Sequence, residues 1–364
     1  MDVARKAEIT LFWNKKNVIN QIKQYVSSIT YTNHEEEATD EITMVLDNTS
    51  AIWSNDWYPA TGDTLQLYIG YQNRQIDTGL FEIDDVSFSG PPDQVTIKAI
   101  SAGISQALRT RNNKAFEDQT LKQIALFYCR KYGFTLVDGS NMLSQIFLDR
   151  KTQENKTDLF FLSELAKEYG FMFTIKGQKM VFISYHDLEE TASVCEIDKS
   201  QISNYDINVK TFDTYFGGQI RQRNRKKGKL VTYNLNGVLS GSSDTVIITG
   251  SVASGSQAEA KVKGGLWGKN KYKQSGTIVI PGEPLLVAGN NSDLTGLGLV
   301  SGKYHIPTST HIVDGSGGYT TSLEVRLTGS IPKPKRIPRT KKVKPTTSET
   351  AFESLGETNE NTDE

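Results

Sequence analysis

Apolar residues alternate with polar ones in short stretches at both ends of the chain, which is the pattern of half-buried strands. In the first hundred residues, with turn residues in between, the alternation covers residues 9–13, 27–31, 42–46, 65–69, 81–88 and 95–99. It returns in residues 215–220, 230–233, 244–249, 276–280, 302–306 and 320–327. Short strands at this spacing predict a barrel or a sandwich in each of the two regions.

Residues 97–181 show a different pattern. Two similar segments, 120–134 and 158–171, place their apolar residues on one helical face, follow a Thr or Asp cap, and end at Gly133 and Gly170. After Gly170 the period changes to two, and a Gly-Gln turn predicts a hairpin. We expect a polar linker before the first helix, at 106–116, and a return linker with weak strand character at 197–209. A short helix is expected at 256–266.

These patterns predict a mainly β protein with an α/β insertion. The expected division is a first barrel-like domain at 1–105, the insertion and return linker at 106–209, a second barrel-like domain at 210–329, and an extension at 330–364.

The extension has an unusual composition. Four prolines and seven basic residues lie between 331 and 345, and a polar segment with six acidic residues follows. Such a segment buries too little apolar surface to offset chain entropy, so we expect disorder unless a partner orders it. It is either a solvated tail or a segment that binds a neighbouring protein. Its basic residues are Lys333, Lys335, Arg336, Arg339, Lys341, Lys342 and Lys344.

A second basic stretch lies at 221–229, where six of nine residues are basic. It reads as a hairpin tip that is solvated, salt-bridged to another subunit, or in contact with nucleic acid. The last alternative lacks the interleaved aromatic residues of single-strand binders. The candidate interface or lumen contacts are Arg221, Arg223, Arg225, Lys226, Lys227 and Lys229.

Composition narrows the class of protein. In 364 residues, 41 Lys and Arg against 42 Asp and Glu give a net charge of −1, which argues against a dedicated nucleic-acid binder. Apolar residues make up 37%, which fits long polar strand edges or an oligomer better than one large enzyme. Cys129 and Cys195 form no metal or redox motif, and Cys129 is expected to be a buried free thiol. No apolar run approaches the about 20 residues of a membrane span, so we expect no membrane anchor and synthesis in a reducing cytosol.

The search for chemistry predicts no catalytic, cofactor-binding or metal residues and no cofactor. The acidic run 34–37 reads as a solvated loop, and the glycines of 296–302 fit neither phosphate-binding fingerprint. The histidines have no metal-ligand spacing, although two of them flank an expected turn at Pro307. The four are His34, His186, His305 and His311.

Five segments carry a family resemblance, and they lie at 56–63, 101–111, 115–121, 149–162 and 318–325. In order and spacing they resemble the late control D family of baseplate hubs in phages and contractile injection systems, which is related to the N-terminal part of VgrG spike proteins. The resemblance covers about residues 5–329. The basic stretch at 221–229 and the extension depart from the family.

The resemblance implies two tube-type β-barrel domains in one chain and a homotrimeric ring whose six barrels imitate the sixfold tail tube. It implies a tail tube protein above the ring, a trimeric spike below, wedge or sheath components beside it, and DNA or effector passing through the lumen without specific recognition. The expected place of such a non-enzymatic hub, after synthesis in the bacterial cytoplasm, is the baseplate of a virion or injection particle. The alternative is a tail-associated cell-wall binding or hydrolysing protein, which needs a catalytic constellation or an exposed aromatic platform.

Overall fold

A computed structural model describes most of the chain. The chain divides into two compact units, residues 1–332 and 333–364, and the second lies outside the described residues. The described residues are 6–35, 39–101, 110–210, 212–223, 228, 230–236, 244–250, 252, 255–315 and 318–329.

The first β region forms where alternation predicts it. Its strands are β1 (Glu8–Trp13), β2 (Lys16–Asn17), β3 (Val26–His34), β4 (Glu41–Asp47), β5 (Thr64–Tyr71), β6 (Arg74–Ser89) and β7 (Gln94–Ser101). Short helical turns lie between them at α1 (Ile19–Ile22), η1 (Lys23–Tyr25) and η2 (Ile52–Ser54). Alternate apolar side chains, such as Ile42, Met44 and Leu46, are buried in one core. The strand order is β3-β4-β7-β6-β5-β1-β2.

The second β region repeats this plan. Its strands are β13 (Ser193–Asp198), β14 (Asn204–Val209), β18 (Gln274–Pro281), β19 (Asn291–Thr295), β20 (Gly302–Asp314) and β21 (Tyr319–Leu327), with η4 (Lys199–Gln201) and η5 (Gly298–Val300) between them. Their order, β14-β18-β21-β20-β19-β13, matches β3-β4-β7-β6-β5-β1 strand for strand. The direction differs in one place, because β13 runs parallel to β19 whereas β1 runs antiparallel to β5.

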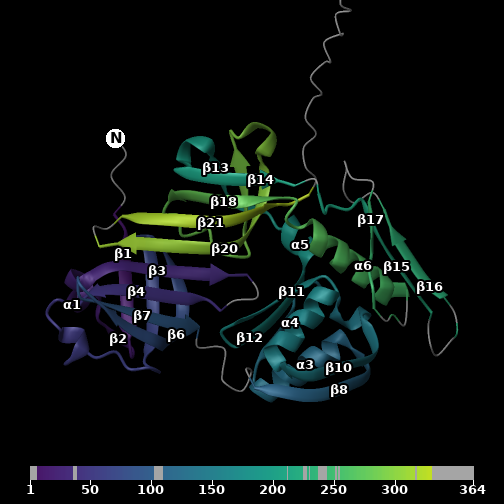
Figure 1. Ribbon diagram of the computed structural model, residues 1–364, viewed down its shortest axis with the longest axis horizontal. Helices are drawn as coiled ribbons and strands as arrows, with labels where there is room; N and C mark the ends of the chain where they lie inside the picture. The colour runs from purple at the N-terminus through teal and green to yellow at the C-terminus, as the bar shows by residue number, and fades with distance from the viewer. Residues whose placement is uncertain are drawn as a thin grey trace, which may run out of the picture. The chain divides into compact units, whose positions relative to one another are not determined.

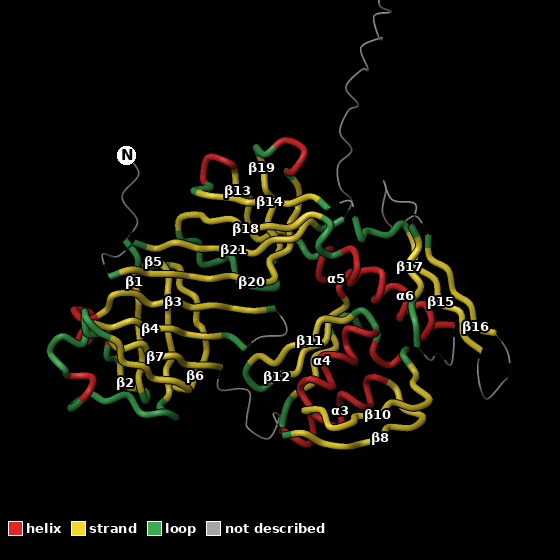
Figure 2. Tube along the Cα trace, in the orientation of Figure 1, coloured by secondary structure: helices red, strands yellow, loops and turns green. Residues whose placement is uncertain are grey.

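The two regions share one sheet. β3 pairs antiparallel with β20, from His34 opposite Thr308 to Ser28 opposite Asp314. Figure 1 shows β4, β3, β20 and β21 in adjacent rows, and Figure 2 shows the same rows in the Cα trace. The strands of these two regions thereby form a continuous 13-stranded sheet with two cores, the first of which also includes Val313 of β20 and Tyr319 of β21. The mainly β fold is confirmed. The pairing of β3 with β20, which joins the two regions, is a feature that the alternation pattern did not predict.

The insertion contains both expected helices. It consists of β8 (Arg111–Thr120), α3 (Leu121–Tyr132), β9 (Thr135–Asp138), η3 (Leu143–Gln145), β10 (Phe147–Thr157), α4 (Asp158–Glu168), β11 (Phe171–Lys176), β12 (Lys179–Ser184) and α5 (Tyr185–Glu190). Thr120 and Gln123 form a capping box at α3, and Thr157 caps α4. Gly133 and Gly170 adopt φ values of 75° and 80°, which a Cβ disfavours. The β11–β12 hairpin is confirmed.

Both expected linkers contain strands. Of the linker expected at 106–116, residues 106–109 lie outside the described residues and residues 111–116 belong to β8, which pairs with β10. Residues 197–209, expected as a return linker with weak strand character, include the end of β13 and the whole of β14, and both strands belong to the large sheet. β8 and β10 carry few apolar residues, so the alternation that identifies a half-buried strand is missing from them.

A second insertion separates β14 from β18. It contains β15 (Gly217–Arg223), β16 (Leu230–Leu235), β17 (Thr245–Ile247) and α6 (Gly255–Asn270). We expected its strands within the second barrel, but in the described residues they pair among themselves as a three-stranded sheet. The helix expected at 256–266 is confirmed and is one turn longer. Among the described residues, no helix has the length and apolarity to cross a bilayer.

Candidate functional site: the seam of the sheet

Buried histidines lie along the seam between β3 and β20. His311 of β20 stacks on Tyr31 of β3, with ring centroids 6.1 Å apart. The hydroxyl of Ser309 donates to the carbonyl of Leu286 at 2.5 Å, so it accepts from Nε2 of His311 at 2.9 Å. Nδ1 of His311 then accepts from the hydroxyl of Tyr319 at 2.8 Å. Burial lowers the pKa of His311 to about 4, so the ring is neutral at pH 7 and contributes to packing.

A buried charge cluster lies at the end of the same seam. Glu35, directly after β3, is 3% exposed, and it meets His305 of β20, which is fully buried. Oε1 of Glu35 lies 2.9 Å from Nε2 of His305. Burial raises the pKa of Glu35, but the hydrogen bond from His305 and the charge of Arg326 outweigh burial and hold it below its ordinary value. Glu35 is therefore an ionised carboxylate inside the protein.

The proton in this cluster can be placed from its neighbours. The side-chain amide of Asn291 donates to the carbonyls of Leu188 and Thr191, at 2.9 and 2.7 Å. Its oxygen must therefore accept from Nδ1 of His305, 2.7 Å away. The carboxylate of Glu35 is ionised, so its contact with Nε2 of His305 is a charge-assisted hydrogen bond.

Arg326 of β21 extends the cluster to the insertions. Its guanidinium lies 3.5 Å from Oε2 of Glu35 and 4.5 Å from the ring centre of Trp267 in α6. Trp267 stacks on Tyr185 of α5, with centroids 3.4 Å apart, and donates to Glu189 at 2.8 Å. This joint, which we define as Glu35, His305, Arg326, Trp267 and Tyr185, connects both β regions to both insertions.

The joint contains acid–base residue types, but its geometry favours structure over catalysis. Glu35, His305 and Arg326 are each at most 3% exposed, so no substrate reaches them. Among the described residues, no group of three or more metal-ligating side chains comes together. A buried ion cluster of this kind specifies how elements dock, and removing one member leaves the other charges unpaired.

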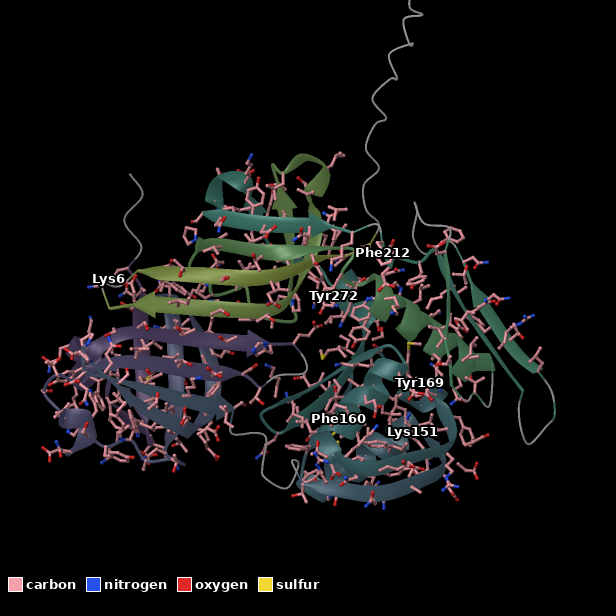
Figure 3. The ribbon with its side chains drawn as sticks, viewed as in Figure 1. Lys6, Lys151, Phe160, Tyr169, Phe212 and Tyr272 are labelled. Carbon is pink, nitrogen blue, oxygen red and sulfur yellow. The ribbon has the colours of Figure 1, made fainter. Side chains whose placement is uncertain are left out.

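The two insertions also contact each other through close backbone approach. A Cβ on Gly264 of α6 would lie 2.5 Å from the backbone nitrogen of Gly170, at the end of α4. Beside this contact, Lys261 pairs with Glu168 at 2.6 Å, and Gln257 donates to the hydroxyl of Tyr169 at 3.0 Å. Tyr169 is labelled in Figure 3. Small residues at this crossing allow α6 to pack against the insertion module.

A pocket of about 790 Å³ lies between α6 and the segments that lead into and out of the second insertion. Phe212 and Tyr272, both labelled in Figure 3, line it together with Lys210, Lys269 and Lys273. Neither a histidine nor a cysteine is among its lining residues, and Asp213 is the carboxylate among them. The pocket therefore lacks the paired groups that acid–base or nucleophilic catalysis needs.

The sequence-predicted contact residues are described only in part. Arg221 lies in β15 and is exposed, and β15 and β16 pair antiparallel on either side of the basic stretch. The side chain of Arg223, and the whole of Arg225, Lys226, Lys227 and Lys229, lie outside the described residues. So do the basic residues of the extension, Lys333, Lys335, Arg336, Arg339, Lys341, Lys342 and Lys344. Their roles stay predictions.

Two expectations from the sequence were wrong, one about the burial of an acidic residue and one about a turn. Glu35 belongs to the run that we expected as a solvated loop, yet it is buried because His305 and Arg326 pair with it from distant strands. The expected turn at Pro307 is instead an irregularity inside β20, where the pairing register with β21 shifts. A glutamate next to a strand end carries no local signal of burial, so the sequence offered no way to find the site around Glu35.

The prediction that Cys129 is a buried free thiol is confirmed.

Comparison with known proteins gives relatives in phage tails. No family model matches the chain. It is 25% identical over 171 residues to the probable baseplate hub protein of Escherichia phage 186, a match that covers 47% of this chain and 43% of that protein. The corresponding protein of Escherichia phage P2 is also 25% identical, over 174 residues, 48% of this chain and 44% of that one. The matched region thus spans less than half the length of these curated relatives.

Solved structures share the fold across most of the chain. The 43 kDa tail protein of prophage MuSo2 from Shewanella oneidensis has a TM-score of 0.64 at 15% identity, covering 88% of this chain and 98% of that one. A chain of the Francisella PdpA–VgrG complex has a TM-score of 0.50 at 10% identity, covering 91% of this chain and 60% of that one. The resemblance of this chain to the baseplate hub proteins of phage tails is thereby confirmed.

Proposed function

We propose that this chain is a structural subunit of a baseplate hub, three copies of which close into a ring that adapts a sixfold tail tube to a threefold spike. One observation carries the proposal: the two β regions have the same strand order and are joined edge to edge in one sheet. A chain that contains two equivalent units supplies six units in three copies. A ring of this kind matches sixfold symmetry on one side and threefold symmetry on the other.

The division of the chain follows from this role. The two tube-type units are the β regions at 8–101 and 193–327, the second interrupted by β15–β17 and α6. The insertion between them lies outside the repeated plan. In the assembled particle the ring has a tail tube protein on one side and a spike on the other, with wedge or sheath components beside it, and its lumen passes DNA or effector without specific recognition. The chain is made in the bacterial cytoplasm and acts in the baseplate without catalysing a reaction.

Mass measurement and imaging test the proposal. Native mass spectrometry of the purified chain, alone and mixed with its tail tube protein, should give a species of three times 40.5 kDa. Electron microscopy of that species should show a ring with six similar lobes. A protein that stays monomeric under both conditions and never associates with tube ends contradicts the proposal. A cell-wall digestion assay tests the alternative, and we expect no release of soluble fragments.

A further inference from the structure

The repeated strand plan identifies one strand edge that is occupied in the second β region and open in the first. β20 has β21 along one side. Along its other side it has β19 opposite Gly302–His305 and then β3 opposite Thr308–Asp314. β6 is the strand in the same place of the first region. It pairs with β7 on one side, and with β5 on the other as far as Glu82. Within the described residues, no strand pairs with that second side at residues 85–89.

The complementary edge belongs to β14. Its counterpart, β3, lies between β4 and β20. β14 pairs with β18 on one side, and no strand in the described part of the chain pairs with its other side. The backbone N–H of Lys210, directly after β14, donates to the carbonyl of Lys273, directly before β18, so it faces β18. Since alternate residues of an antiparallel strand face alternate sides, the N–H groups of Tyr205, Ile207 and Val209 face the open side.

Both open edges carry exposed apolar side chains. Phe88 of β6 is 44% exposed and stacks on Tyr58, which is 59% exposed, with centroids 6.0 Å apart. On β14, Tyr205 is 44% exposed. Phe88 lies opposite buried Val95 of β7, and Tyr205 lies opposite buried Ile278 of β18, so both side chains are on the core side of the sheet. Exposed apolar residues beside an unpaired strand edge mark a surface that another strand covers.

From these edges we infer that β14 of one copy adds antiparallel to residues 85–89 of β6 in a second copy of this chain, repeating between copies the seam that β3 and β20 form within one. The occupant is another copy because the chain already contains the same junction between equivalent strands. The contact joins two different surfaces, so it propagates from copy to copy until the ring closes. The inference rests on the proposed function and specifies the surface through which it operates.

The paired residues are chemically compatible. With the core-facing side chains on the same face, Tyr205 lies beside Phe88 and Ile207 beside Val86, which is partly buried against the first core. Lys210 follows β14 and comes near Asp84 and Asp85 of the partner strand. The main-chain hydrogen bonds supply affinity, and the apolar pairs set the register.

Disulfide trapping tests the pairing in the full-length chain. Four double variants place cysteines at residue 86 or 88 and at residue 205 or 207: V86C or F88C combined with Y205C or I207C. Paired strands bring such residues within disulfide range, so at least one of the four should form covalent dimers and trimers on oxidation. The matched control is S87C with Y205C, in which Ser87 faces the opposite side of the sheet, and it should remain largely uncrosslinked. The corresponding single-cysteine variants show any crosslinks that form through the native cysteines, Cys129 and Cys195.

A proline variant gives a second, noncovalent test. Ile207→Pro removes an N–H that faces the open side and leaves the bonds to β18 in place, so the chain should stay folded by circular dichroism and lose the three-copy species. If the unmodified chain forms rings while all four cysteine pairs fail and the proline variant still assembles, the strand pairing is overturned and the hub function stands. If the unmodified chain never forms rings, both fail together.

Discussion

At the scale of single residues, the seam is held by side chains whose charge state depends on burial. His311 is neutral because desolvation penalises its charged form, whereas Glu35 is charged because His305 and Arg326 surround it. Both residues bind fewer protons in the folded chain than in the unfolded chain as the pH falls. The seam should therefore weaken in acid, first through His311 and then through Glu35.

His311 determines part of the pH dependence of stability. Its folded pKa of about 4 lies below the ordinary 6.5, so the unfolded chain takes up the proton first, and stability is lost as pH falls from about 7 to 4. The difference between these two pKa values corresponds to about 3 kcal/mol in the free energy of unfolding. Urea unfolding of the wild type and His311→Gln at pH 7 and pH 4 measures it. The wild type should lose more stability than the variant, and equal losses would contradict the assignment.

Glu35 is expected to matter more than any surface carboxylate. Glu35→Gln leaves the guanidinium of Arg326 buried without a counter-charge and should lower the free energy of unfolding by about 3 to 5 kcal/mol. The matched control is Glu117→Gln, because the Glu117 side chain is 63% exposed and lies 3.7 Å from Arg150. That change should stay within about 0.5 kcal/mol. If both substitutions change the free energy of urea unfolding by similar amounts, the joint does not stabilise the fold as we expect.

At the scale of elements, the crossing of α6 and α4 depends on backbone contact. Gly264→Ala places a Cβ 2.5 Å from Gly170, where the neighbouring atoms are backbone and cannot rotate away. We expect a loss of about 1 to 3 kcal/mol in spite of the better helix propensity of alanine.

The same helix offers a matched control for this prediction. A Cβ on Gly268 meets nothing within 4 Å, so Gly268→Ala should be neutral or stabilise by up to about 1 kcal/mol. Thermal unfolding of both variants distinguishes steric from propensity effects. Two glycine replacements that stabilise equally would show that α6 does not need the close approach to α4.

At the scale of the whole molecule, residues 85–89 of β6 and the outer side of β14 are strand edges without a partner among the described residues, and we infer that association covers them. A protein that is stabilised by association unfolds at higher temperature when it is more concentrated. We expect the thermal midpoint of the wild type to rise across about two decades of protein concentration, and that of Ile207→Pro to stay constant. Differential scanning calorimetry measures both, and a wild-type midpoint independent of concentration would contradict assembly through these edges.

The sequence by itself determined the local elements. Alternation placed the strands of the first β region, and caps with glycine stops placed α3 and α4, because those signals lie within a few residues of the element they specify. It missed β8 and β10, whose polar residues carry no alternation. The family resemblance, read from short segments in order, indicated the hub class that the comparisons confirm.

Only the tertiary structure decided how these elements are joined. The pairing of β3 with β20 and the burial of Glu35 against His305, 270 positions away, depend on contacts that local patterns do not encode. The repeated strand order likewise becomes visible once every strand has its neighbours. Propensity and capping act over a few residues, whereas register and edge pairing are set by which distant surfaces bury each other.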